Sequence, residues 1–224
     1  MSICMIPARG GSKRIPRKNI KEFCGKPMIQ WSIEAAQKSG VFDRIIVSTD
    51  DREIADVANS AGAETPFMRP AEISDDHATT AAVIVHTLDF LRDEGNEPDA
   101  ICCLYATAPF VQPEDIRHGQ SELVGNDYVI PVTSFAFPIQ RAVRITDVDR
   151  LEMLDPSQYK TRSQDLEEAY HDVGQFYWGT SVAWREGRAA FGAGAKPLIL
   201  PRYRVQDIDT PEDWVRAEAL FRAL

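Results

Sequence analysis

The stretch Ser2-Ile3-Cys4-Met5-Ile6-Pro7, followed by Ala8-Arg9-Gly10-Gly11-Ser12-Lys13-Arg14-Ile15-Pro16-Arg17-Lys18-Asn19, decides the fold class of this chain. The first six residues form an apolar run that predicts a buried strand. A glycine-rich basic loop follows. A helix is then predicted over 28–38, because Ile29, Ile33 and Ala36 recur on one face. A strand, a loop and a helix in direct succession are typical of an α/β domain.

The alternation continues along most of the 224 residues. It predicts one domain over 1–224, with a mainly parallel sheet covered by helices on both faces. The stretch 137–170 is polar, lacks clear periodicity and breaks the alternation, so we expect an arm or excursion there. The further strands are predicted over 44–48, 100–105, 128–133, 176–184 and 197–201, and the further helices over 50–60, 78–92, 113–123 and from 211 onward.

Charge is distributed unevenly along the chain. The formal net charge is −9, yet segment 9–26 carries seven of the 25 lysines and arginines and one of the 34 acidic residues. That segment is therefore +6 and the remainder −15. An acidic body disfavours nucleic-acid polymers and anionic membranes as partners. The basic segment favours one compact polyanion instead, the alternative being a solvated basic surface loop.

Cysteine usage and hydropathy bear on the compartment. Cys4, Cys24, Cys102 and Cys103 show neither a disulfide framework nor a metal-ligand spacing. No apolar stretch approaches the roughly 18–20 residues that span a bilayer, and the start of the chain does not read as a secretory leader. We therefore expect a reduced, cytoplasmic protein that is not inserted in a membrane.

The basic loop has the chemistry of a phosphate site. Gly10 and Gly11 let backbone N–H groups approach an anion closely, and Arg9, Lys13 and Lys18 supply charge to phosphate oxygens. In open α/β sheets, ligands bind beyond the carboxyl ends of the strands, which is where this loop lies. Neither GxGxxG nor GxxxxGK[ST] is present, so the familiar dinucleotide and triphosphatase motifs do not apply.

Two carboxylates near the end of the chain suit a divalent cation. On an extended segment Asp207 and Asp209 project to the same side, and their hard oxygens suit Mg²⁺. The alternative is a helix start, with Thr210 as N-cap and Pro211 in the first turn. That alternative explains 210–213 and leaves the two aspartates unaccounted for.

A second loop, over 69–80, leads into a predicted helix and offers candidates for reading a pyrimidine edge, Arg69 and Thr79. The competing interpretation is helix capping by Asp75 or Asp76. Asp50, earlier in the chain, allows the same two interpretations: it is as suited to capping the helix after the second strand as to contacting a ligand.

Taken together, these stretches resemble the sugar nucleotidyltransferases that activate nonulosonic (sialic-type) acids with CTP. The resemblance spans essentially the whole chain and implies a Rossmann-like nucleotide-diphospho-sugar transferase fold of three layers. It also implies dependence on Mg²⁺, a homodimer formed through an arm within 137–170, and a place in glycan biosynthesis such as flagellin glycosylation. It rests on Arg9-Gly10-Gly11-Ser12-Lys13 with Lys18-Asn19, Val47-Ser48-Thr49-Asp50-Asp51, Arg69-Pro70 with Ser74-Asp75-Asp76, Thr107-Ala108-Pro109-Phe110, and Asp207-Ile208-Asp209-Thr210-Pro211-Glu212-Asp213.

The resemblance assigns expected roles to residues of this chain. The activity implied is transfer of CMP from CTP to the anomeric hydroxyl of a nine-carbon acidic sugar. The expected catalytic residues are Arg9, Lys13, Lys18 and Asp209, and the expected Mg²⁺ ligands are Asp207 and Asp209. Nucleotide binding is expected from Ala8, Arg9, Gly10, Gly11, Ser12, Lys13, Lys18, Asn19, Arg69 and Thr79, and sugar binding from Tyr105, Thr107, Arg162, Gln175, Phe176 and Tyr177.

Two stretches bear on which sugar is used. Tyr105-Ala106-Thr107-Ala108-Pro109 stands where relatives acting on sialic acid often carry Gln-Pro-Thr-Ser-Pro, and Gly174-Gln175-Phe176-Tyr177-Trp178 resembles the form in members acting on pseudaminic acid. Legionaminic or N-acetylneuraminic acid remains the nearest alternative. An enzyme acting on 3-deoxy-manno-octulosonic acid belongs to a neighbouring family, whose loop usually lacks the double-glycine Ser-Lys form. A non-catalytic nucleotide-binding module is a third alternative.

Overall fold

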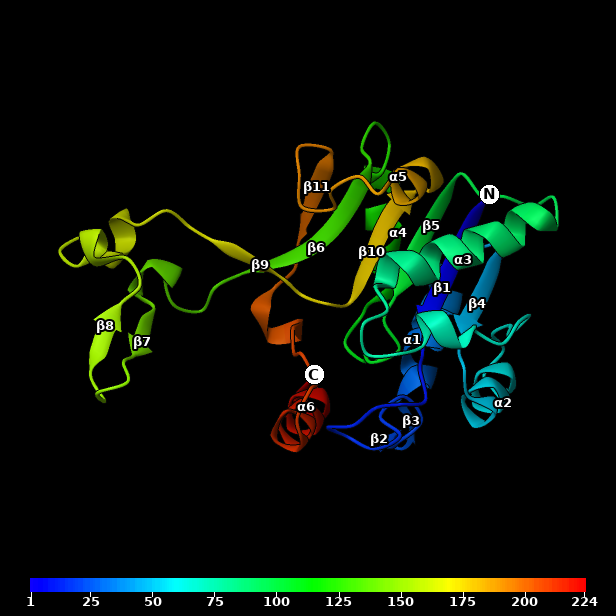
Figure 1. Cartoon of the computed structure of the whole chain (residues 1–224), viewed down its shortest axis with the longest axis horizontal. Coiled ribbons are helices and arrows are strands. Elements are labelled where there is room, and N and C mark those ends of the chain that lie inside the picture. The colour runs from blue at the N-terminus through cyan, green and yellow to red at the C-terminus, as the bar shows by residue number, and fades with distance from the viewer.

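The computed structural model describes residues 1–224 and places the first strand, β1 (Ser2–Pro7), inside a seven-stranded sheet. The sheet order is β11-β6-β10-β5-β1-β4, with β9 beside β6 (Figure 1). The pairs β1–β4, β1–β5 and β6–β11 are parallel. The other strands are β4 (Arg44–Ser48), β5 (Ala100–Leu104), β6 (Tyr128–Ser134), β9 (Tyr170–Asp172), β10 (Phe176–Thr180) and β11 (Ala195–Ile199).

Helices cover both faces of this sheet. Along β1, Ile3 and Met5 face one layer, and Cys4 and Ile6 face the other, because successive strand side chains point to opposite faces. The Ile3 side packs against α3 (Thr80–Asp93) and α5 (Ser181–Glu186). The Cys4 side packs against α1 (Met28–Ser39), α2 (Arg52–Ser60) and α4 (Pro113–Glu122). The predicted three-layer α/β fold is confirmed.

One predicted element is wrong in its second half. The strand expected over 176–184 ends at Thr180, whose hydroxyl oxygen accepts a hydrogen bond from the Ala183 N–H and caps α5. The strand part, β10, is antiparallel to both of its neighbours, β5 and β6. No crossover helix separates β6 from β10, so the chain re-enters the sheet from the opposite end.

The break in alternation corresponds to an arm that projects from the sheet (Figure 1). Beyond the end of β6 the chain forms a small hairpin, β7 (Val143–Ile145) and β8 (Leu151–Met153), and returns through β9. Apolar side chains of the arm face solvent: Phe137 is 82% exposed, Ile145 71% and Leu151 74%. That the arm mediates pairing stays a prediction.

A third apolar cluster joins the basic loop near the start of the chain to the segment that carries Asp207 and Asp209. Helix α6 (Pro211–Ala223) packs beside the short hairpin of β2 (Glu22–Phe23) and β3 (Lys26–Pro27) (Figure 1). The cluster contains both Ile15 of the basic loop and Ile208 of the acidic pair, with Phe23 edge-on to Trp214. The basic loop and the acidic pair are therefore anchored in the same apolar cluster.

No helix of the structure combines the length and the hydropathy that crossing a membrane would take.

Candidate active site

A cleft of about 290 Å³ opens at the carboxyl ends of β1 and β5. The position agrees with the rule for ligand sites in open α/β sheets. Its formal charges are five cations (Arg9, Lys13, Arg14, Lys18 and Arg69) against three carboxylates (Asp75, Asp76 and Asp209). An anionic ligand would complement this excess. The residues predicted from sequence that line it are Arg9, Ser12, Lys13, Lys18, Asn19, Arg69, Tyr105, Thr107 and Asp209.

The two acids after β4 hold the basic loop in place. The Asp50 carboxylate accepts a hydrogen bond from the Gly10 N–H at 2.9 Å, and Asp51 caps α2 by accepting from the Glu53 and Ile54 N–H groups. A Cβ at Gly10 would lie 2.7 Å from Asp51 Oδ2, so only glycine fits this approach. Of the pair, Asp51 is the cap. The Gly10 amide, predicted to bind phosphate, is occupied by Asp50 in this structure.

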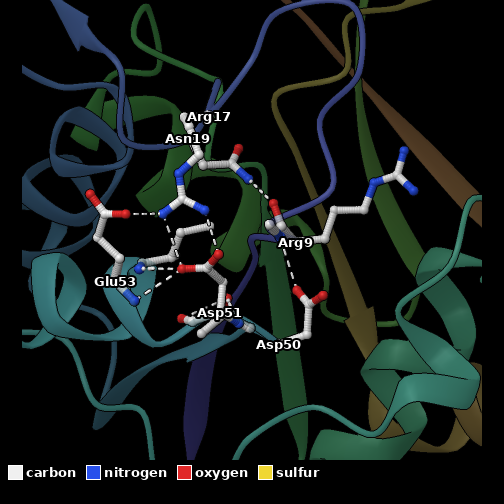
Figure 2. A network of polar contacts seen from close by, with 9 residues as sticks. Arg9, Arg17, Asn19, Asp50, Asp51 and Glu53 are labelled. Atoms are coloured by element: carbon white, nitrogen blue, oxygen red, sulfur yellow. Dashed lines mark hydrogen bonds and ion pairs between the residues drawn. The ribbon is translucent and has the colours of Figure 1, made fainter.

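The cations of the basic segment divide into two groups. Arg17, in a left-handed conformation (φ 57°), faces Asp51 and Glu53 and donates to both, as Figure 2 shows. Its guanidinium lowers the pKa of Asp51. The Arg9 guanidinium points away from this cluster (Figure 2), and the Arg9 carbonyl accepts a 2.9 Å hydrogen bond from Asn19. Arg17 thus anchors the loop, whereas Arg9 lines the cleft.

Two carboxylates pair with four of the five cleft cations. Asp76 accepts hydrogen bonds from Lys13 and, at 2.6 Å, from Arg9. Both bonds lower the pKa of Asp76, and the bond from Lys13 has the larger effect. On the opposite side Asp209 pairs with Arg14 at 2.9 Å and with Lys18 at 3.3 Å. The cations predicted to hold phosphate therefore all line the cleft, and each of them is paired with a carboxylate.

Arg69 is buried in the cleft wall with unused hydrogen-bonding capacity. It is 7% exposed, donates one bond to the Ser48 carbonyl at 2.9 Å, and its Nε has no partner. Burial lowers its pKa. A buried donor without an acceptor is costly, so the site favours a ligand that brings one. Thr79 lies elsewhere: its hydroxyl caps α3 by accepting from the Ala82 N–H, and Thr80 lines the cleft.

The acidic pair flanks the anchoring side chain of Ile208, which is 1% exposed. Burial, and then the neighbouring Asp209 charge, raise the pKa of Asp207. Thr210 and Asp213 form a reciprocal capping box for α6, so the helix-start interpretation holds for 210–213. The Asp209 N–H also donates to Asp213 at 3.2 Å, but the carboxylates of Asp207 and Asp209 take no part in the box and repel each other. Such a donor set fits Mg²⁺, which typically binds one or two carboxylates together with substrate phosphates.

Several predicted sugar-binding residues are not brought to the cleft. Arg162 lies on the arm and pairs with Asp165 at 2.6 Å. Gln175, 4% exposed, donates to the Arg204 carbonyl, and Phe176 is fully buried in the core. Tyr177 does not line the cleft itself but packs edge-on against Tyr105. Among the residues predicted to bind the nucleotide or the metal, Ala8 is buried in the core. Gly11 and Asp207 do not line the cleft.

Nine of the eighteen lining residues are outside the predicted site set, and Arg14, Asp76 and Thr80 are among them. Arg14 belongs to the basic segment but carried no individual signal. Asp76 was considered only as a helix cap, and its pairing with the loop joins segments more than 60 residues apart. Thr80 is next to the selected Thr79, and only the exact start of α3 decides which hydroxyl caps and which faces the cleft.

Comparison with known proteins gives consistent similarities. The cytidylyltransferase family model matches residues 3–178. The chain is 44% identical over 223 residues to the pseudaminic acid cytidylyltransferase of Campylobacter jejuni subsp. jejuni serotype O:2, covering 99% of this chain and 96% of that protein. It is 34% identical over 231 residues to the CMP-N,N'-diacetyllegionaminic acid synthase of Legionella pneumophila subsp. pneumophila, covering 98% and 95%. A solved structure of CMP:2-keto-3-deoxy-manno-octonic acid synthetase complexed with CTP shares the fold, with a TM-score of 0.71, 18% identity, and coverage of 99% of this chain and 98% of that one.

Proposed function

Because the chain belongs to the cytidylyltransferase family, we propose that it transfers CMP from CTP to the anomeric hydroxyl of pseudaminic acid, releasing pyrophosphate. The observation that carries this proposal is the 44% identity to a pseudaminic acid cytidylyltransferase over nearly the whole of both chains. The cleft supports it independently, since its excess of cations directly after β1 suits a triphosphate.

In the proposed reaction the anomeric oxygen attacks the α-phosphorus in line, and the bond from that phosphorus to the β-phosphate oxygen breaks. The sugar hydroxyl loses its proton, and pyrophosphate leaves with the bonding pair. Little covalent chemistry is required of the protein, so positioning and electrostatic stabilisation dominate. Arg9, Lys13 and Lys18 hold the triphosphate in this proposal, and Asn19 supports the nucleotide side by fixing the Arg9 carbonyl.

Asp207 and Asp209 are the residues that would hold Mg²⁺. They are adjacent carboxylates outside the helix cap, and the structure brings no cluster of three or more His, Cys, Asp or Glu together that could hold a metal ion. Mg²⁺ typically binds one or two carboxylates together with substrate phosphates, so two aspartates are enough for such a site. Once bound, the ion supplies charge neutralisation at the α-phosphate and lowers the pKa of a coordinated hydroxyl.

The oligomeric state and compartment form a finer part of the proposal. The exposed apolar side chains of the arm support pairing with a second copy of this chain, and Arg162 on that arm is then available to the partner's sugar site. We place the protein in the cytoplasm as a homodimer, its product serving glycan biosynthesis such as flagellin glycosylation.

The proposed function is tested by measuring pyrophosphate release with CTP, Mg²⁺ and a panel of nine-carbon acids. Turnover of pseudaminic acid well above legionaminic and N-acetylneuraminic acid is the expected result. Preference for legionaminic acid would favour the alternative to which the Legionella relative points. Release with none of the acids, in a protein that still binds CTP, would assign a nucleotide-binding module instead.

Asp76 should compete with the triphosphate for its two cations. In Asp76→Asn, Arg9 and Lys13 no longer face a carboxylate charge, so we expect KM for CTP to fall about two- to fivefold, the scale of exposed ion pairs. The measurement is CTP steady-state kinetics at low and at high salt, with the difference shrinking at high salt.

The control for this prediction is Asp93→Asn, which removes an acidic charge at the far end of α3, the helix that follows the loop carrying Asp76. KM for CTP in that variant should equal that of the wild type. A rise in KM for Asp76→Asn would show that Asp76 organises the loop for CTP rather than competing with it.

A further inference from the structure

A line of polar side chains leads from the base of the arm to the cleft. Asp172, the last residue of β9, accepts a hydrogen bond from the Tyr177 hydroxyl on β10. Its other carboxylate oxygen accepts from the Gly174 N–H at 3.0 Å. The carboxylate is thus held by a tight turn on one side and by a phenol on the other, although its side chain is exposed to solvent.

The line continues from Tyr177 to the cleft wall. The rings of Tyr177 and Tyr105 meet edge to face, with centroids 5.6 Å apart and planes at 87°. The Tyr105 hydroxyl lies 3.2 Å from the hydroxyl of Thr80 in the first turn of α3, and both of these residues line the cleft. Three stretches that are far apart in sequence, at Thr80, at Tyr105 and at 172–177, therefore meet through these aromatic and polar contacts.

Both phenols remain protonated at neutral pH. Burial raises the pKa of Tyr105 to about 12, and burial together with Tyr105 and Asp172 also raises the pKa of Tyr177. In the hydrogen bond between them, the Tyr177 hydroxyl donates and the Asp172 carboxylate accepts. The Tyr177 side chain therefore makes both contacts: its hydroxyl bonds to Asp172, and its ring packs edge-on against Tyr105.

The cleft wall reached by this line differs from the phosphate side. Residues there carry no formal charge: Thr80, Val83, Tyr105, Ala106 and Thr107. Hydroxyl and methyl groups of this kind suit the neutral hydroxyl and acylamino substituents of a sugar, whereas the cations of the basic loop suit phosphate. The uncharged wall formed by these five residues therefore offers different chemistry from the cations of the lining.

We propose that Asp172 is a positioning residue that, through Tyr177, orients Tyr105 and so tunes which nine-carbon acidic sugar the uncharged wall accepts. The inference rests on the proposed function. It assigns the discrimination between sugars to a carboxylate that lies outside the cleft, where the chain returns from the arm.

The test uses Asp172→Asn, Tyr177→Phe and the double variant of the full chain, with sugar and CTP varied in turn. Each single variant is expected to raise KM for pseudaminic acid about tenfold, which converts to about 1.4 kcal/mol and matches one hydrogen bond to a charged group. KM for CTP should stay within about twofold, which is roughly 0.4 kcal/mol. Because both substitutions break the same bond, the double variant should be no worse than either single variant.

Tyr128→Phe is the matched control. Tyr128 also donates its hydroxyl, to the Arg188 carbonyl at 3.1 Å, but it lies at the amino end of β6, opposite the cleft. It should leave both KM values unchanged. Discrimination between pseudaminic and legionaminic acid should weaken in the Asp172 and Tyr177 variants and not in this one.

Each other outcome overturns the inference. Additive losses, equal rises in KM for CTP and for sugar, or no change would show that Asp172 does not position the sugar side. If Asp172→Asn fails to fold, Tyr177→Phe, which keeps the ring, decides the question alone. Wild-type protein that turns over no nine-carbon acid would overturn the proposed function and this inference with it, whereas normal wild-type turnover with unaffected variants overturns the inference alone.

Discussion

Replacing Asp209 by alanine is expected to lower kcat by about a thousandfold, the scale seen when one preorganised electrostatic contact to the transition state is lost. Asp209 would ligate Mg²⁺ together with Asp207, and it also receives Lys18 and Arg14. Its loss would remove a metal ligand and release a cation that is predicted to hold phosphate. The free energy of unfolding should change by less than about 1 kcal/mol, because Asp209 is 35% exposed and ion pairs open to solvent contribute little.

The measurements are pyrophosphate release over a Mg²⁺ titration and urea unfolding of the same preparation. The variant should need more Mg²⁺ for its residual activity. Glu212→Gln is the control: it removes a carboxylate in the first turn of α6, outside both the acidic pair and the capping box, and should keep normal turnover. Near-normal turnover of Asp209→Ala would rule out this metal site.

The second large effect is expected from Lys18→Ala, with kcat/KM for CTP reduced about a hundredfold, in line with removal of a charged group that stabilises a transferring phosphoryl. Lys18 is 19% exposed, donates to the Ile208 carbonyl at 2.8 Å, and lies 3.3 Å from Asp209. It therefore joins the basic loop to the acidic pair. The loss should appear with CTP as the varied substrate more than with the sugar.

Lys21→Ala provides the matched control for Lys18. Both lysines belong to the basic segment, but the Lys21 ammonium lies over the Trp214 ring, 4.3 Å from its centroid, and does not line the cleft. This control should retain its CTP kinetics with a small loss of thermal stability. Unchanged CTP kinetics in Lys18→Ala would mean that the loop is a solvated basic surface after all.

The alternation of strands and helices could be predicted from the sequence because it depends on local patterns of residues. Ile29, Ile33 and Ala36 do form the buried face of α1, and the apolar run of β1 is buried on both sides of the sheet. The error at 181–184 has a local cause as well: Thr180 can either extend a strand or cap a helix, and the packing of Trp184 against Tyr128 accompanies the second choice.

The chemistry of the site could be predicted from the sequence, whereas the set of residues that line it could be predicted only in part. The excess of cations in 9–26 pointed to an anion, yet nothing local distinguishes Arg17, which anchors the loop on Asp51, from Lys18, which lines the cleft. The choice between Thr79 and Thr80 required the helix start. Gln175 has a side chain suited to binding a sugar, but its amide N–H donates to the Arg204 carbonyl instead.

By itself, the sequence determined the α/β architecture, the charge of the first loop and the paired carboxylates, because periodicity, charge and residue spacing are properties of short segments. The tertiary structure alone decided which charges meet. Asp76 reaches Lys13 and Asp209 reaches Lys18 because the sheet gathers the ends of its strands at one edge and a shared apolar cluster holds Ile15 with Ile208. Such contacts depend on distances through space that spacing along the chain does not encode.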